Sequence, residues 1–88
     1  MATLLAVDLG LKAGLAVYGE DGRLTSYRSH NFGSAARLRR GAPAILAGLE
    51  DAAWLALEGG GQIADIWEAA AARRGLPALR IGAEVWRQ

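Results

Sequence analysis

Asp8 and Glu58 are the two acidic residues whose sequence context is typical of a ligand-binding or catalytic site. Each directly follows an apolar run, at residues 3–7 and 54–57, and such runs predict β-strands. The first run shows no polar alternation, so we expect its strand to be buried on both faces. Polar side chains at the carboxyl ends of strands face the crevice in which α/β sheets bind ligands. If the two strands are neighbours, the carboxylates converge.

Converging carboxylates repel each other, and a divalent cation between them removes the repulsion. Mg²⁺ prefers oxygen ligands, so the pair predicts a Mg²⁺ site, with Mn²⁺ as a substitute. Two such ions about 3.5–4 Å apart can activate a water and stabilise the leaving 3′-oxygen in phosphodiester hydrolysis. In that arrangement Asp8 would bridge both ions and Glu58 would bind one. The alternative is that both carboxylates only end strands at the surface.

The rest of the sequence predicts the elements that would position these acids. The Asp-Gly pair at residues 21–22 predicts a tight hairpin, and Gly10 and Gly14 predict a turn between the first two strands. Ser34 is a candidate N-cap for a helix that begins at residue 35. Pro43 lacks an amide hydrogen, so we expect two short helices after Ser34, the second beginning at Pro43, rather than one continuous helix. The predicted strands are 3–7, 15–19, 24–29, 54–58 and 78–81, and the predicted helices are 35–40, one beginning at Pro43, and 62–74.

With the two short helices counted as one unit, the order β-β-β-α-β-α-β predicts an α/β fold with a mixed sheet. The first three strands should form an antiparallel meander, and a right-handed crossover should make the fourth and fifth strands parallel. This order is similar to the first two-thirds of the RNase H-like fold. We therefore expect one such domain over residues 1–88, with Trp54 and Trp67 in its core.

Residues 4–17 resemble the opening strand-turn-strand of the RuvC-type Holliday-junction resolvases, in which an apolar strand ending in Asp-x-Gly carries the first catalytic aspartate. Residues 55–58, Leu-Ala-Leu-Glu, resemble the fourth strand of that family, whose closing glutamate is the second ligand. Residues 85–87 resemble the basic segment that leads to its later helices. The resemblance implies a Mg²⁺-dependent endonuclease that cuts branched DNA as a homodimer, with Asp8 and Glu58 as catalytic metal ligands.

The sequence departs from that family in the number of acidic metal ligands that it contains. Such nucleases take a third and usually a fourth acidic ligand from a helix beyond the fifth strand, and this sequence ends at Gln88 before any such helix. We expect a C-terminal truncation that leaves the chain inactive as it stands. The alternatives are that activity is absent or that another chain completes the site. The other acids considered are Asp65 and Glu68, expected on the solvated face of a helix, Glu84 in the tail, and Glu50, which could mimic the helix-borne glutamate of true ribonucleases H.

Basic residues supply candidate nucleic-acid contacts. Lys12, in the turn after Gly10, could contact a scissile phosphate, and Arg37, Arg39 and Arg40 could position a DNA backbone through salt-sensitive contacts. Exposed turn and helix positions explain these residues about equally well. The net charge of +1 does not by itself indicate a nucleic-acid partner.

Composition excludes several classes of protein. The sequence has no cysteine, so disulfides and thiolate metal sites are excluded. No apolar run approaches the roughly 18 residues that a membrane span needs, and the first ten residues do not resemble a signal peptide. We therefore expect a cytoplasmic protein without a membrane partner.

Three other hypotheses remain open. The sugar-kinase, actin and heat-shock superfamily opens with a similar strand, Asp-x-Gly and Asp-Gly hairpin that hold Mg²⁺ and ATP phosphates, although Leu11 stands where those turns carry threonine or serine. The YqgF-type ribosomal-RNA processing nucleases have an opening close to residues 8–12, but their fourth strand does not normally end in glutamate. The last hypothesis is a catalytically inactive RNase H-like module used for binding or dimerisation.

Overall fold

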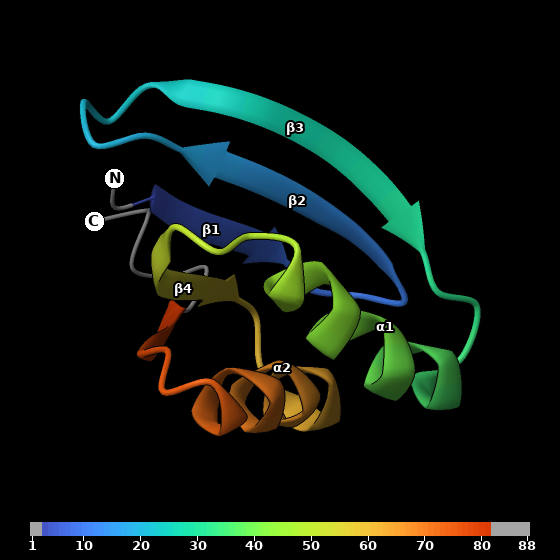
Figure 1. Ribbon diagram of the computed structural model, residues 1–88. Helices are drawn as coiled ribbons and strands as arrows, with labels where there is room; N and C mark the ends of the chain where they lie inside the picture. The colour runs from blue at the N-terminus through green and yellow to red at the C-terminus, as the bar shows by residue number, and fades with distance from the viewer. Residues whose placement is uncertain (1–2, 82–88) are drawn as a thin grey trace.

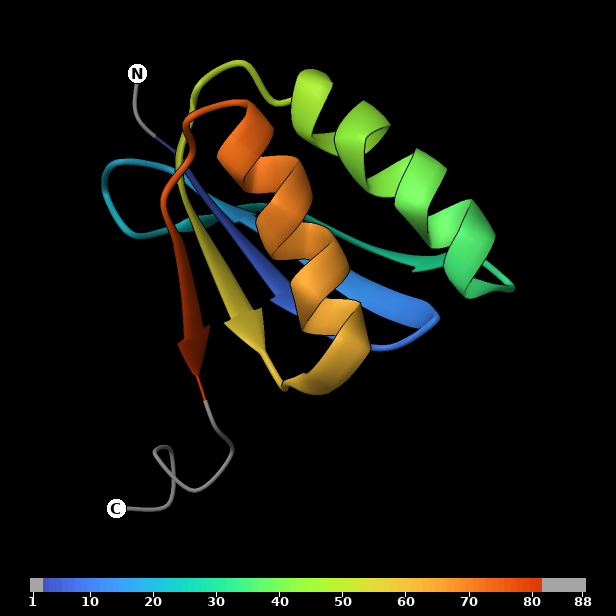
Figure 2. The same ribbon diagram turned by 90° about the horizontal axis from the view of Figure 1, so that it is seen from below.

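A five-stranded mixed sheet with two helices forms the fold of residues 3–81, the part of the chain that the structure, a computed structural model, describes. The element order along the chain is the predicted one, and both helices cover the same face of the sheet (Figures 1 and 2). The elements are β1 (Thr3–Asp8), β2 (Lys12–Tyr18), β3 (Leu24–Asn31), α1 (Ala35–Ala47), β4 (Ala52–Glu58), α2 (Gly61–Arg73) and β5 (Ala78–Ile81).

The sheet has the spatial order β3-β2-β1-β4-β5, which differs from the order of the strands along the chain. The expected antiparallel meander of β1, β2 and β3 and the parallel pairing of β4 with β5 are confirmed. In addition, β1 pairs in parallel with β4, so β1, β4 and β5 point the same way (Figure 2). This pairing places the strand that opens the chain at the centre of the sheet.

The predicted hairpin between β2 and β3 is also confirmed. Gly22 has a φ of 78°, which glycine adopts without steric strain, and its amide donates to the carbonyl of Gly19 over 3.0 Å. The amide of Arg23 donates to Asp21 Oδ1 over 3.0 Å, so the aspartate stabilises the turn locally.

The hydrophobic core lies between the sheet and the helices. Alternate strand residues, among them Leu5 and Val7 on β1 and Leu57 on β4, pack there against Trp67 of α2, whose side chain is fully buried. The opposite face of the sheet carries no helix from the described residues, so the prediction that β1 is buried on both faces is wrong. Trp54 lies on that open face and is 57% exposed, whereas the sequence predicted it in the core.

A single helix, α1, spans the segment that the sequence divided at Pro43. Its side chains Leu38, Ala42 and Leu46 follow one another at four-residue intervals and are all buried, so continuity of the helix preserves an unbroken apolar stripe. Ser34 Oγ caps the helix by accepting from the amide of Arg37 over 3.2 Å. Burial of the whole stripe outweighs the roughly 3 kcal/mol that a proline costs within a helix.

We expect Pro43→Ala to raise the free energy of unfolding by about 1–3 kcal/mol, because alanine restores a helical hydrogen bond and removes the clash of the proline ring. Urea denaturation followed by tryptophan fluorescence measures the change. Pro77→Ala, in the loop before β5, is the matched control and should leave stability unchanged or slightly lower. A Pro43→Ala variant no more stable than the parent would contradict this account of α1.

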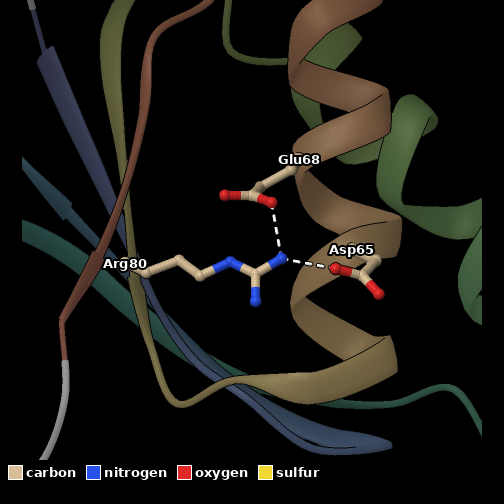
Figure 3. Close-up of polar contacts among 3 residues, drawn as sticks. All are labelled: Asp65, Glu68 and Arg80. Atoms are coloured by element: carbon tan, nitrogen blue, oxygen red, sulfur yellow. Dashed lines mark hydrogen bonds and ion pairs between the residues drawn. The ribbon is translucent and has the colours of Figure 1, made fainter.

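A cluster of three charged residues ties α2 to the edge strand β5. Arg80 Nη2 donates to Asp65 Oδ1 over 2.5 Å and to Glu68 Oε1 over 2.6 Å (Figure 3). Asp65 and Glu68 are therefore not simply a solvated helix face, as the sequence suggested, but partners of a strand residue. The hydrogen bond from Arg80, with its positive charge, lowers the pKa of Glu68 below its ordinary value of 4.5 and raises the pKa of Arg80.

This cluster makes stability depend on pH in a defined direction. Because the pKa of Glu68 is lower in the folded chain, its contribution is complete above pH 4.5 and is lost as the pH falls through the lowered pKa. We therefore expect Glu68→Gln to be less stable than the parent at pH 7, with a difference that disappears towards pH 3. Urea denaturation across this range measures it, and Glu50→Gln, an exposed glutamate outside the cluster, is the control. A difference that persists unchanged in acid would contradict the role of the ion pair.

Neither helix within residues 3–81 has the length and apolarity needed to cross a membrane.

Candidate functional site

The structure brings Asp8 and Glu58 together at one edge of the sheet. The two residues are direct partners in the parallel register of β1 and β4, and the amide of Leu9 donates to the carbonyl of Glu58 over 3.1 Å. Neighbouring strands lie about 4.8 Å apart, so residues in register on one face are close neighbours. The sequence predicted that Asp8 and Glu58 would lie together if their strands were neighbours, and the pairing of β1 with β4 meets that condition.

Both carboxylates lie on the open face of the sheet. Their neighbours in sequence, Val7 and Leu57, are buried under the helices, and alternation along a strand directs the next side chain to the other face. Asp8 and Glu58 are both exposed, and within residues 3–81 neither forms an ion pair with a basic side chain. Two adjacent carboxylates thus share a solvent-accessible position without a protein cation between them.

An apolar groove of about 650 Å³ runs along the open face, with the carboxylate pair at one end. Small residues make the floor of the groove: Ala6, Ala16 and Ala56 come from three adjacent strands. Glu20, which follows β2, lines the groove at the end away from Asp8, because β2 runs antiparallel to β1. The groove is therefore a concave surface in which two carboxylates, Asp8 and Glu58, lie together at the carboxyl ends of β1 and β4.

Tyr27 is a candidate site residue that the sequence did not reveal. It lines the same groove and is 62% exposed, and a Cβ atom at Gly14 would lie 2.8 Å from its hydroxyl oxygen and 3.5 Å from the Cβ of Asp8. Gly14 was predicted in a turn, but it lies inside β2, directly opposite Asp8. A glycine within a strand often marks a close approach of another group, and that was the available signal.

Lys12, the candidate phosphate contact, is the first residue of β2 and is exposed. Strand alternation places it on the face of Gly14, two residues further towards the β1–β2 turn, and therefore on the face of Asp8. The structure thus keeps Lys12 on the same side of the sheet as the carboxylates.

Arg37, Arg39 and Arg40 lie instead on α1, which covers the opposite face of the sheet. All three are exposed, and Arg39 shares a groove of about 270 Å³ between the helices with Arg73 of α2. The structure therefore does not bring these arginines to the face from which Asp8 and Glu58 project. Any nucleic acid that they contact would have to pass around the edge of the sheet to reach the carboxylates.

No third acidic residue joins the pair within residues 3–81, and that range contains no cluster of three or more potential metal ligands. Glu50 lies in the connection between α1 and β4, at the opposite end of β4 from Glu58, so it does not take the place of a helix-borne ligand. Asp65 and Glu68 are held by Arg80 on the helix side. Glu84 and the segment 85–87 fall outside the described residues.

No model of a known protein family matches the sequence, and no curated protein matches it.

The geometry predicts that the carboxylate pair destabilises the metal-free chain. At low ionic strength in the presence of a chelator, Asp8→Asn or Glu58→Gln should raise the free energy of unfolding by roughly 0.2–1 kcal/mol, because like charges directly opposite each other repel. The double variant should gain little more than either single variant, since each alone removes the repulsion. Urea denaturation of all three tests this, and fully additive gains would show that the two carboxylates act independently.

Proposed function

We propose that the chain is the metal-binding part of an RNase H-like, divalent-metal-dependent endonuclease of the RuvC type that acts on branched DNA. The observation that supports this most directly is the in-register pairing of Asp8 with Glu58 at the carboxyl ends of adjacent parallel strands. The sequence resemblance assigned the same two residues to metal binding. The mixed sheet with β1 between β2 and β4 is compatible with that assignment.

The donor set fits a hard divalent cation. Both groups are carboxylates, both are exposed on one face, and no protein cation within residues 3–81 neutralises them. Mg²⁺ is commonly bound through one or two carboxylates together with water and substrate phosphate oxygens. Two acids are thus sufficient for an initial site, and further ligands would have to come from the substrate, from water or from outside residues 3–81.

Within this proposal each residue has a distinct task. Asp8 and Glu58 hold the ion, which when bound supplies electrophilic stabilisation of a phosphodiester and activation of a nucleophile. Lys12, on the same face, supplies a positive charge for the phosphate backbone. A homodimer would present two such sites to the two symmetric strands of a four-way junction.

A catalytically inactive RNase H-like binding module is the second candidate. It is favoured by one observation, the lack of a third acid beside the pair within residues 3–81. The two candidates differ in whether the carboxylate pair binds a divalent cation in solution.

We expect calorimetric titration of Mg²⁺ and Mn²⁺ to show binding by the chain. Asp8→Asn and Glu58→Gln should each weaken the affinity at least about tenfold, because even the loss of groups that only orient metal ligands costs 10–100-fold. Glu50→Gln removes a comparable charge at the far end of β4 and should bind as the parent does. Absence of binding by the parent, or equal binding by all variants, would favour the inactive module.

A further inference from the structure

The hydroxyl of Tyr27 lies over the backbone of Gly14, beside Asp8. In the register of β2 and β3, Tyr27 stands opposite Ala16, and Gly14 stands opposite Ser29. The phenol therefore leans along the sheet by two residue positions of β2, from Ala16 to Gly14, towards the edge at which Asp8 and Glu58 lie. It reaches that position because position 14 carries no side chain.

Neither packing nor hydrogen bonding within the protein explains this placement. The side chain is 62% exposed, so it contributes little to the core, and its hydroxyl has no hydrogen-bond partner within residues 3–81. A tyrosine hydroxyl is a donor without a formal charge, and donors of this kind serve sites that bind anions. Here the donor stands at the end of the groove at which Asp8 and Glu58 lie.

We infer that Tyr27 is a substrate-binding residue whose hydroxyl donates a hydrogen bond to a non-bridging oxygen of a phosphodiester lying at Asp8 and Glu58. The inference rests on the proposed function, because a phosphodiester approaches two carboxylates only when a divalent cation is present. Tyr27 adds a directional contact from the β3 side of the groove, and Gly14 provides the space for it.

Gly14 offers an independent test because it controls the position of the phenol without being part of it. Its φ does not lie in the left-handed region, so alanine fits the strand backbone there. The added methyl would stand 2.8 Å from the hydroxyl oxygen, which is the far end of a movable side chain, and only 3.5 Å from the Cβ of Asp8, an ordinary contact. Gly14→Ala should therefore displace the hydroxyl while the fold and the carboxylates remain.

The experiment measures binding rather than cleavage. With the chain saturated by Mn²⁺, paramagnetic broadening of the ³¹P signal of dimethyl phosphate reports the affinity for a simple phosphodiester, and calorimetry reports the Mn²⁺ affinity separately. The variants are Tyr27→Phe, Gly14→Ala and the double variant. Tyr18→Phe is the matched control, because it removes a phenol hydroxyl from the opposite end of the same groove.

We expect Tyr27→Phe and Gly14→Ala each to weaken dimethyl phosphate binding about tenfold, near the lower end for a hydrogen bond to a charged group, with Mn²⁺ affinity unchanged. The double variant should be no weaker than either single variant, and Tyr18→Phe should match the parent.

Three results would overturn the inference while leaving the metal site intact. The first is unchanged phosphodiester binding in Tyr27→Phe. The second is a loss of Mn²⁺ affinity in Tyr27→Phe, which would mean that the hydroxyl supports the carboxylates rather than the phosphodiester. The third is normal phosphodiester binding in Gly14→Ala despite a loss in Tyr27→Phe. Absence of Mn²⁺ binding by the parent chain is a different result, because it would remove the proposed function and this inference together.

Discussion

The parallel pairing of β1 with β4 is the constraint on which the rest of the structure depends. β1 is the central strand, and its hydrogen bonds to β4 join the antiparallel meander of residues 3–31 to the parallel unit that follows. The pairing aligns Leu5 with Leu55 and Val7 with Leu57, so the same register that builds the core also sets Asp8 beside Glu58. A shift by one residue would turn the apolar side chains to the open face and separate the carboxylates.

The two faces of the sheet have different roles as a consequence. The helix-covered face carries the large buried side chains, whereas the open face carries small residues over which a groove forms. That division leaves Trp54 and Leu79 substantially exposed. The residues that stabilise the fold are therefore largely separate from those proposed to bind ligands, so substitutions at the site can be made without removing core packing.

Two pairs of acids, Asp65 with Glu68 and Asp8 with Glu58, have different electrostatic surroundings. Asp65 and Glu68 share the guanidinium of Arg80, which lowers the pKa of Glu68 and ties α2 to β5 (Figure 3). Asp8 and Glu58 are set side by side by backbone pairing, but no basic side chain within residues 3–81 forms an ion pair with either. The first pair is a structural contact, and the second is the pair proposed to bind an external cation.

Local sequence patterns were enough to predict the β-β-β-α-β-α-β order, the Asp21-Gly22 hairpin, the cap at Ser34 and the two carboxylates at strand ends, because each depends on a few consecutive residues. Local patterns failed where a distant contact outweighed them. Pro43 was accommodated because the whole of α1 buries one apolar stripe, and Trp54 was exposed because no described helix covers its face. Three arrangements became visible only in the three-dimensional fold: β1 pairs with β4, Arg80 binds two acids of α2, and Tyr27 reaches over Gly14 to Asp8. These arrangements arise from packing and hydrogen bonding between segments far apart in the chain, which composition and periodicity do not encode.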